Sequence, residues 1–105
     1  MQLINVKLTL TDKTLSYNLR TLVQTYITSL GDDLVSIYRA KHLKIQFDPD
    51  NITSKYYIGG VSTGKLYLGG QETDFGPFPT PQVELGKILL NCDEDAKTIN
   101  VTVIP

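Results

Sequence analysis

The chain alternates between apolar and polar side chains over residues 3–10. Ile4, Val6, Leu8 and Leu10 fall on one face, and Asn5, Lys7 and Thr9 fall on the other. Alternation over this length predicts a β-strand with one face in the core and the other in water. Related patterns predict further strands over residues 34–39, 42–48, 56–58, 83–90 and 98–104, of which 83–90 is interrupted near Gly86.

Between residues 18 and 30 the apolar positions follow a helical period instead. They are Leu19, Leu22, Val23, Tyr26, Ile27 and Leu30. This spacing predicts one amphipathic helix, with Ser16 or Asn18 as its N-cap and Gly31 at its C-terminal end. The polar face contains threonines, which lower helix propensity, so we expect the helix to depend on packing against a sheet.

Turn signals separate the predicted strands. Asp48-Pro49-Asp50-Asn51 predicts a turn, because proline presets φ and Asp and Asn side chains bond to the local backbone. Residues 71–82 contain three of the five prolines. That stretch cannot be an interior strand, and we expect a loop that folds back over an end of the core.

The predicted strands do not alternate with helices, which disfavours a parallel α/β sheet. The pattern predicts a mostly β protein: a single antiparallel β-sandwich or jelly-roll-like barrel over residues 1–105, with about seven or eight short strands. The early α-helix, at about residues 18–30, is expected to cover one open end of the sandwich.

The stretch 55–70 contains the motif Tyr-x-Gly-Gly twice at a spacing of ten residues. Glycine reaches positive φ without a steric clash, so each copy predicts a strand that ends in a sharp turn or bulge. The expected turn glycines are Gly59, Gly60, Gly64, Gly69 and Gly70. The candidate contact residues are Tyr56, Tyr57 and Tyr67, although strand tyrosines more often pack on neighbouring strands.

Residues 59–65 also fit the G-x-x-x-x-G-K spacing of a phosphate-binding loop. Three features argue against nucleotide binding. Residue 66 is a leucine where a magnesium-binding hydroxyl is required, and the following residues 66–70 end in two glycines and cannot form the helix that would hold phosphate. The surrounding pattern is all-β. We therefore expect a hairpin or bulged loop, with Lys65 exposed on a strand edge.

Composition and charge narrow the function classes. With 105 residues, 41% of them hydrophobic and 20% charged, the chain has the length and balance of one soluble globular domain. Ten basic and eleven acidic residues give a net charge of −1 and no footprint for nucleic acid or an anionic membrane. No apolar run is long enough to span a bilayer, and the alternating first residues predict no secretory signal.

Residue types that bind metals or carry catalysis are scarce. Cys92 and His42 are the sole cysteine and histidine, so no intramolecular disulfide or cysteine-based metal cluster is expected, and His42 is predicted to be an exposed polar residue. The run Asp93–Asp95 suggests a weak calcium site, but it lacks the loop pattern of such sites, and a charged turn is favoured. We predict a non-enzymatic protein with no catalytic residues, cofactor or metal.

Several of these features follow one another in a familiar order. The Asp48–Asn51 turn leads into Tyr57-Ile58-Gly59, then a Gly/Pro-rich loop, then Gln82–Leu85 and a terminal alternating strand over 99–104. This order, over about two-thirds of the chain, resembles small virion structural proteins of tailed bacteriophages. The Pro-Gly-Glu step of that pattern is replaced by Pro81-Gln82-Val83-Glu84.

The resemblance implies a non-enzymatic β-module assembled on a phage particle as head decoration, neck component or spike base. Its implied partners are other virion proteins (capsid, neck or tail subunits) and further copies of itself, with no nucleic acid or membrane partner. The implied location is the virion, assembled in the host cytoplasm. Symmetric self-association is expected because virion positions repeat.

A ligand-binding β-sandwich that recognises glycans or a host surface is the alternative. Glycan binding predicts exposed tyrosines gathered in one shallow groove with acid and amide partners. Assembly instead predicts a flat apolar patch or an unpaired edge strand.

Overall fold

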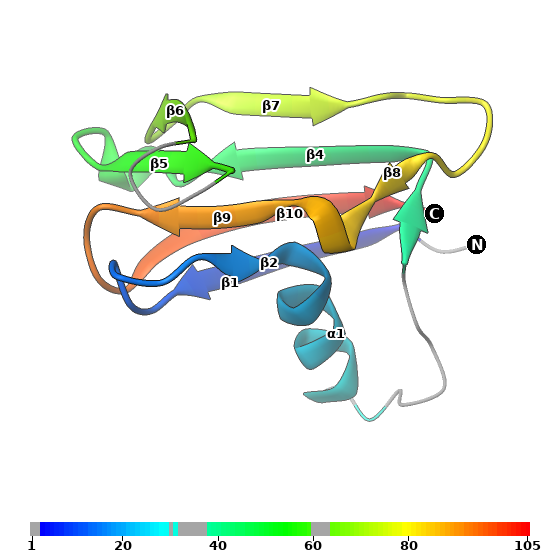
Figure 1. Ribbon diagram of the computed structural model, residues 1–105, viewed down its shortest axis with the longest axis horizontal. Coiled ribbons are helices and arrows are strands. Elements are labelled where there is room, and N and C mark those ends of the chain that lie inside the picture. Colours follow the sequence, from blue (N-terminus) through cyan, green and yellow to red (C-terminus); the bar gives the residue numbers. More distant parts are fainter. Residues whose placement is uncertain (1–2, 30, 32–37, 60–63) are drawn as a thin grey trace.

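The computed structural model describes residues 3–29, 31, 38–59 and 64–105. The chain is mostly β, with one α-helix among these residues (Figure 1). The elements are β1 (Ile4–Leu10), β2 (Tyr17–Asn18), α1 (Leu19–Ser29), β3 (Arg39–Ala40), β4 (His42–Phe47), the 3-10 turn η1 (Pro49–Asn51), β5 (Lys55–Ile58), β6 (Lys65–Leu68), β7 (Glu72–Phe75), β8 (Val83–Glu84), the 3-10 turn η2 (Leu85–Lys87), β9 (Leu89–Cys92) and β10 (Lys97–Ile104).

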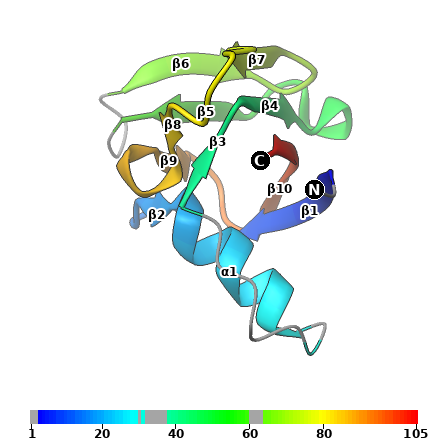
Figure 2. The ribbon, with the colours of Figure 1, turned by 90° about the vertical axis from the view of Figure 1, so that its right-hand side faces the viewer.

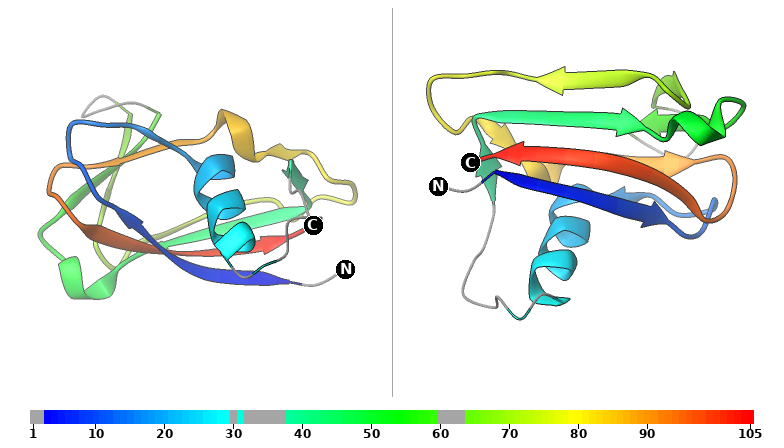
Figure 3. Two further views of the ribbon diagram at one scale, coloured as in Figure 1. Left: turned by 90° about the horizontal axis from the view of Figure 1, so that it is seen from below. Right: turned by 180° about the vertical axis from the view of Figure 1, so that it is seen from behind.

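The strands form two four-stranded antiparallel sheets. Sheet A has the order β1-β10-β4-β7 and sheet B the order β2-β9-β5-β6, while β3 and β8 form a separate short pair. The sheets lie face to face in a sandwich-like arrangement (Figure 3, left). No strand pairing among the described residues joins one sheet to the other, so the barrel that the sequence also allowed does not close.

The core lies between the two sheets, and sheet A supplies its most regular part. The register places Val6 opposite Val101 and Val101 opposite Ile45, and each of these side chains is at most 3% exposed. A second apolar row joins Leu8, Ile99 and Phe47. The alternation in residues 3–10, 42–48 and 98–104 therefore predicted these strands and their inward faces correctly.

Helix α1 confirms the predicted helix to within one residue at each end. Asn18 Oδ1 accepts a hydrogen bond from the backbone N–H of Thr21 at 3.3 Å, which identifies Asn18 as the N-cap. Gly31 has φ of +81° and donates its N–H to the carbonyl of Thr28 at 2.9 Å. Of the apolar positions that predicted the helix, which form a stripe along one side of it, Leu19, Val23 and Ile27 are buried. Leu30 lies outside the described residues.

The sequence analysis expected the helix to cover an open end of the sandwich, but the helix lies elsewhere. It contacts β1, β2 and η2, and it lies along the side where the edge strands of the two sheets approach each other (Figure 2). The reason is local: β2 ends at Asn18 and α1 begins at Leu19 with no loop between them. The apolar stripe therefore closes a lateral opening between the sheets.

The prediction of a loop over residues 71–82 is wrong for the first part of that stretch. Residues Glu72–Phe75 form β7, which pairs with β4 at the edge of sheet A, with Thr73 opposite Ile45. The prolines of this segment all follow at positions 77, 79 and 81, so they leave the ladder donors of β7 intact. The position of β7 at a sheet edge agrees with the exclusion of an interior strand.

Two further strand predictions are altered. Of the strand expected over 34–39, residues 34–37 lie outside the described residues, and Arg39 begins the two-residue strand β3, opposite Glu84 on β8. The strand expected over 83–90 is divided into β8, η2 and β9, with Gly86 in the middle of η2. The interruption near Gly86 was therefore predicted correctly.

Candidate functional site

The first Tyr-x-Gly-Gly copy ends one arm of a hairpin. Strands β5 and β6 are antiparallel, with Ile58 opposite Lys65. Gly59 has φ of +128°, a value that favours glycine, and donates its N–H to Leu89 on β9 at 2.9 Å. A Cβ on Gly64 would lie 2.2 Å from the carbonyl oxygen of Ile58, so only glycine fits there. Gly60 lies outside the described residues.

The nucleotide-binding alternative fails on the same geometry. Lys65 is exposed and begins strand β6, so the chain continues as a strand where a phosphate loop requires a helix. Its ammonium nitrogen lies 5.5 Å from the ring centroid of Tyr67. Lys65 is thus the exposed residue on a strand edge that the sequence predicted.

The second copy turns the chain from one sheet to the other. Gly69 and Gly70 connect β6, the edge of sheet B, to β7, the edge of sheet A. Gly70 has φ of +87° and donates its N–H to the carbonyl of Phe47 at 2.8 Å. Beside it, the N–H of Leu68 donates to Gln71 Oε1 at 2.6 Å, and the N–H of Gln71 donates back to the Leu68 carbonyl at 3.1 Å.

The turn at residues 48–51 is organised by a buried carboxylate. Pro49–Asn51 form η1, and Asp48 caps it by accepting the N–H of Asp50 at 2.9 Å. Asp48 is 6% exposed and also accepts the hydroxyl of Thr98, with the ammonium of Lys7 at 3.7 Å. These contacts, led by the hydroxyl of Thr98, lower the pKa of Asp48 below its usual value. The side chain thus ties the end of β4 to β10 and β1.

The three candidate contact tyrosines occupy different environments. Tyr56 is fully buried and donates its hydroxyl to the carbonyl of Thr98 at 3.0 Å, so its assignment as a contact residue is wrong. Tyr67 is half-buried; its ring stacks on Phe47 at 4.8 Å, and its hydroxyl lies 3.2 Å from that of Thr73 on β7. Both rings belong to the interior because Phe47, between them, belongs to the other sheet.

Tyr57 points to the opposite side of sheet B. It is half-buried, and the register places it beside Leu66, with Leu68 next along β6. Leu66 is 50% exposed and Leu68 is 40% exposed. We call the surface of Tyr57, Leu66 and Leu68 the leucine face. Other described apolar side chains are also exposed, among them Leu15 and Ile52, but Leu66 and Leu68 are neighbours on one face of an edge strand.

The outer side of sheet A, which faces the viewer in Figure 3 (right), is mostly polar, with Leu3 and Ile104 exposed at one end. A shallow hollow of about 260 Å³ there is lined by Asn5, Lys44, Gln46, Glu72, Asn100 and Thr102. Lys44 pairs with Glu72 at 3.3 Å, and His42 Nε2 lies 2.9 Å from Asp74 Oδ1. His42 is thus a partly exposed polar residue on this face. The two outer faces of the sandwich therefore differ in chemistry.

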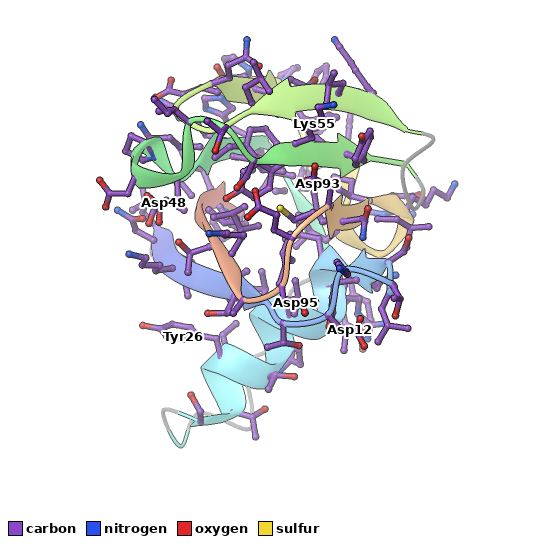
Figure 4. The ribbon with its side chains drawn as sticks, turned by 90° about the vertical axis from the view of Figure 1, so that its left-hand side faces the viewer. Asp12, Tyr26, Asp48, Lys55, Asp93 and Asp95 are labelled. Carbon is purple, nitrogen blue, oxygen red and sulfur yellow. The ribbon has the colours of Figure 1, made fainter. Side chains whose placement is uncertain are left out.

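The side chains of the acidic turn at residues 93–95 form hydrogen bonds that hold neighbouring segments together. Asp93 Oδ1 accepts the N–H of Lys55 at 2.9 Å, and Glu94 Oε1 accepts the hydroxyl of Ser54 at 2.9 Å. Asp95 Oδ1 accepts the N–H of Lys13 at 2.9 Å, on the other side of the turn (Figure 4). Asp93 and Glu94 both bond to the chain at the start of β5 and Asp95 bonds to a different segment, so the three carboxylates do not converge on one cation. No cluster of three metal-binding side chains exists among the described residues.

Cys92, just before this turn, is 1% exposed and faces the core. Burial raises the pKa of its thiol, so the thiol stays protonated at neutral pH. A buried neutral thiol is a packing group, not a nucleophile.

Two adjoining hollows lie at the other end of sheet B, around β8 and η2. The larger, of about 600 Å³, is bordered by Phe75, Phe78 and Val83 among others. The smaller, of about 440 Å³, lies between η2 and the first turn of α1. Both share Glu84 and Lys87, whose charged atoms are 2.8 Å apart.

The sequence did not indicate the residues of the smaller hollow. Arg20 falls on the polar face of the predicted helix, and Tyr38, Arg39 and Lys87 belong to segments far from it in the chain. No motif spacing connects them, because they meet only when β3 pairs with β8. The acid-base pattern at Glu84 and Lys87 was the one local signal present in the sequence.

No family model, curated protein or solved structure matches the chain. Among the helices that the structure describes, none combines the length and the apolar character needed to cross a bilayer.

Proposed function

We propose that this protein is a non-enzymatic structural module that associates with copies of itself through the leucine face, in the particle of a tailed bacteriophage. In this proposal residues 1–105 form one jelly-roll-like sandwich domain that serves as head decoration, neck component or spike base. Its other partners are capsid, neck or tail subunits of the virion.

The observation that carries the self-association is the exposure of Leu66 and Leu68 beside Tyr57 on one outer face, while the assignment to a phage particle rests on the order of motifs along the sequence. Full burial of an exposed leucine side chain stabilises an association by about 1.5–3 kcal/mol before ordering costs, and Leu66 and Leu68, which are 50% and 40% exposed, can each gain about half of that. In a symmetric pair each leucine is counted twice, so even a small patch supports weak association. Repeated weak contacts suffice in a particle where each subunit has several neighbours.

The edge of β6 favours contact through side chains over extension of the sheet. The backbone N–H and carbonyl of Leu68 already bond to Gln71, on the side of the strand that faces away from β5. In an antiparallel ladder such outward groups alternate along the strand, so Leu66 is the other residue of β6 that could pair with an incoming strand. One residue is too short a ladder for a stable added strand.

Most of the outer side of sheet A is unsuited to such a contact. Its side chains include Asn5, Lys44 and Gln46, and burying them without partners would cost free energy.

Sedimentation or light scattering across a concentration series tests this proposal. We expect the wild-type mass to rise between about 10 µM and 1 mM, the range of weak interfaces. Leu66→Lys should keep the protein monomeric, because the new charge would be buried in the contact. Thr9→Lys adds the same charge to an exposed strand position on sheet A and should leave association unchanged. A wild-type protein that stays monomeric throughout would contradict the proposal.

Glycan recognition through tyrosines has no comparable support. Tyr56 is buried and Tyr67 stacks in the interior, so neither can join Tyr57 in a surface groove. None of the three hollows described above is lined by Tyr56, Tyr57 or Tyr67.

A further inference from the structure

The smaller hollow beside η2 has an excess of positive charge. Its lining consists of Arg20, Tyr38, Arg39, Glu84, Gly86 and Lys87. Three of these side chains are cationic and one is a carboxylate, which gives a local charge of 3 − 1 = +2. The whole chain carries −1, so this hollow stands out against its surroundings.

Glu84 holds two of the cations at the rim. Its Oε1 lies 3.2 Å from the guanidinium of Arg39, and its Oε2 lies 2.8 Å from the ammonium of Lys87. The side chains of Arg39 and Lys87 are 61% and 81% exposed, so each keeps further donors directed to solvent. A bound anion can therefore use these donors without displacing Glu84.

Arg20 is positioned differently. Its guanidinium carbon lies 3.9 Å from the ring centroid of Tyr38, and its Nε atom is buried without a hydrogen-bond partner among the described residues. Stacking on the ring fixes the plane of the guanidinium, which lowers the entropy that a ligand must remove on binding. Because Nε is buried, a ligand in the hollow can pair only with the terminal Nη groups of this guanidinium.

We propose that this hollow is a binding site for a small ligand that carries a carboxylate or a phosphate group. Arg20 anchors the anion in two-point fashion, since the guanidinium fork matches both groups, and Arg39 and Lys87 complete the charge balance. The volume of about 440 Å³ suits a ligand of a few rings or a sugar unit. This site lies on α1, β3 and η2, away from β6 (Figure 1), so it is independent of the leucine face.

NMR titration of the arginine Nε–H signals tests the site directly. Inorganic phosphate, acetate and glucuronate are added separately, with glucose as the neutral control and sodium chloride holding the ionic strength constant. We expect a saturable shift of the Arg20 signal with at least one of the three anions. Binding of phosphate alone would identify a phosphorylated ligand, and binding of acetate or glucuronate a carboxylated one. A shift with glucose alone, or with none of the four, would overturn the proposal.

Variants separate a specific site from general attraction of anions. Arg20→Gln should weaken binding about tenfold, as expected for loss of a charge-assisted pair. Lys87→Gln changes a side chain that is 81% exposed and should weaken binding about threefold without affecting the fold. Lys65→Gln removes an exposed cation on β6 and should leave the affinity unchanged. If Arg20→Gln does not fold, Lys87→Gln decides the matter; equal affinities of wild type, Lys87→Gln and Lys65→Gln would reject the site.

Discussion

Asp48 connects several segments of the chain through its carboxylate. It is almost fully buried, yet it accepts hydrogen bonds from the Thr98 hydroxyl and the Asp50 amide and faces the ammonium of Lys7. A buried carboxylate with this many donors stabilises the fold while it is ionised. The turn at 48–51 is therefore both a chain reversal and a cross-link between strands.

Replacing Asp48 with asparagine should lower the free energy of unfolding at pH 7 by about 1–3 kcal/mol, because the buried side chain loses its charge and one of its two accepting oxygens. The hydrogen bonds lower the pKa of Asp48 in the folded state. Its contribution is therefore present above the unfolded pKa and is lost as pH falls through the folded value. Urea unfolding at pH 7 and at about pH 3 should show a smaller difference between wild type and variant at the lower pH. Equal differences would mean that the charge is irrelevant.

At the level of elements, the β5–β6 hairpin depends on glycine at its closing positions. Gly59 adopts positive φ, and a side chain at Gly64 would collide with the backbone of Ile58. Backbone atoms cannot rotate away as a flexible side chain can. The hairpin must therefore open or shift to accept any Cβ at residue 64.

We expect Gly64→Ala to lower the free energy of unfolding by more than about 2 kcal/mol, since relief of the clash must disturb the hairpin. Gly86→Ala is the matched control. A Cβ there would meet Arg20 Cδ at 3.8 Å, an ordinary contact, so its cost should stay below about 0.5 kcal/mol. Chemical unfolding of the two variants measures both values. Similar losses at the two positions would show that the clash is absorbed elsewhere.

Elements were predictable where periodicity is long. Strands β1, β4 and β10 each alternate over six residues or more, and α1 repeats its apolar positions over three turns. The strands of sheet B were harder to predict, because β2 has two residues and β9 has four, which is too short for a clear alternation. The edge strand β7 was missed because the prolines that follow it dominated the local signal.

At the scale of the whole molecule, the two lateral sides of the sandwich are closed by different means. Helix α1 covers the side of β1 and β2, while the short connection through Gly69 and Gly70 links β6 to β7 on the other (Figure 2). Tyr67 adds a hydroxyl contact across the second side, to Thr73. Neither closure was predictable from local sequence, because each depends on which edge strands the fold brings together.

The two candidate surfaces could be predicted from the sequence only in part, because each depends on which segments the fold brings together. The sequence indicated Tyr57 as a contact residue, but the exposure of Leu66 and Leu68 follows from the position of β6 at a sheet edge. The cationic hollow joins residue 20 to residues near 38 and 86, and only the tertiary fold defines it.

The burial of Cys92 provides a measurement of unfolding that requires no introduced label. This single thiol lies on β9 between β2 and β5, opposite Tyr56, so a reagent reaches it when sheet B opens. We expect dithionitrobenzoate to react at least about 10³-fold more slowly with the native protein than with the urea-unfolded chain, as a stability of about 5 kcal/mol requires. Reaction at the unfolded rate in native buffer would contradict the burial. The labelling rate would also rank Asp48→Asn and Gly64→Ala by how often each variant opens.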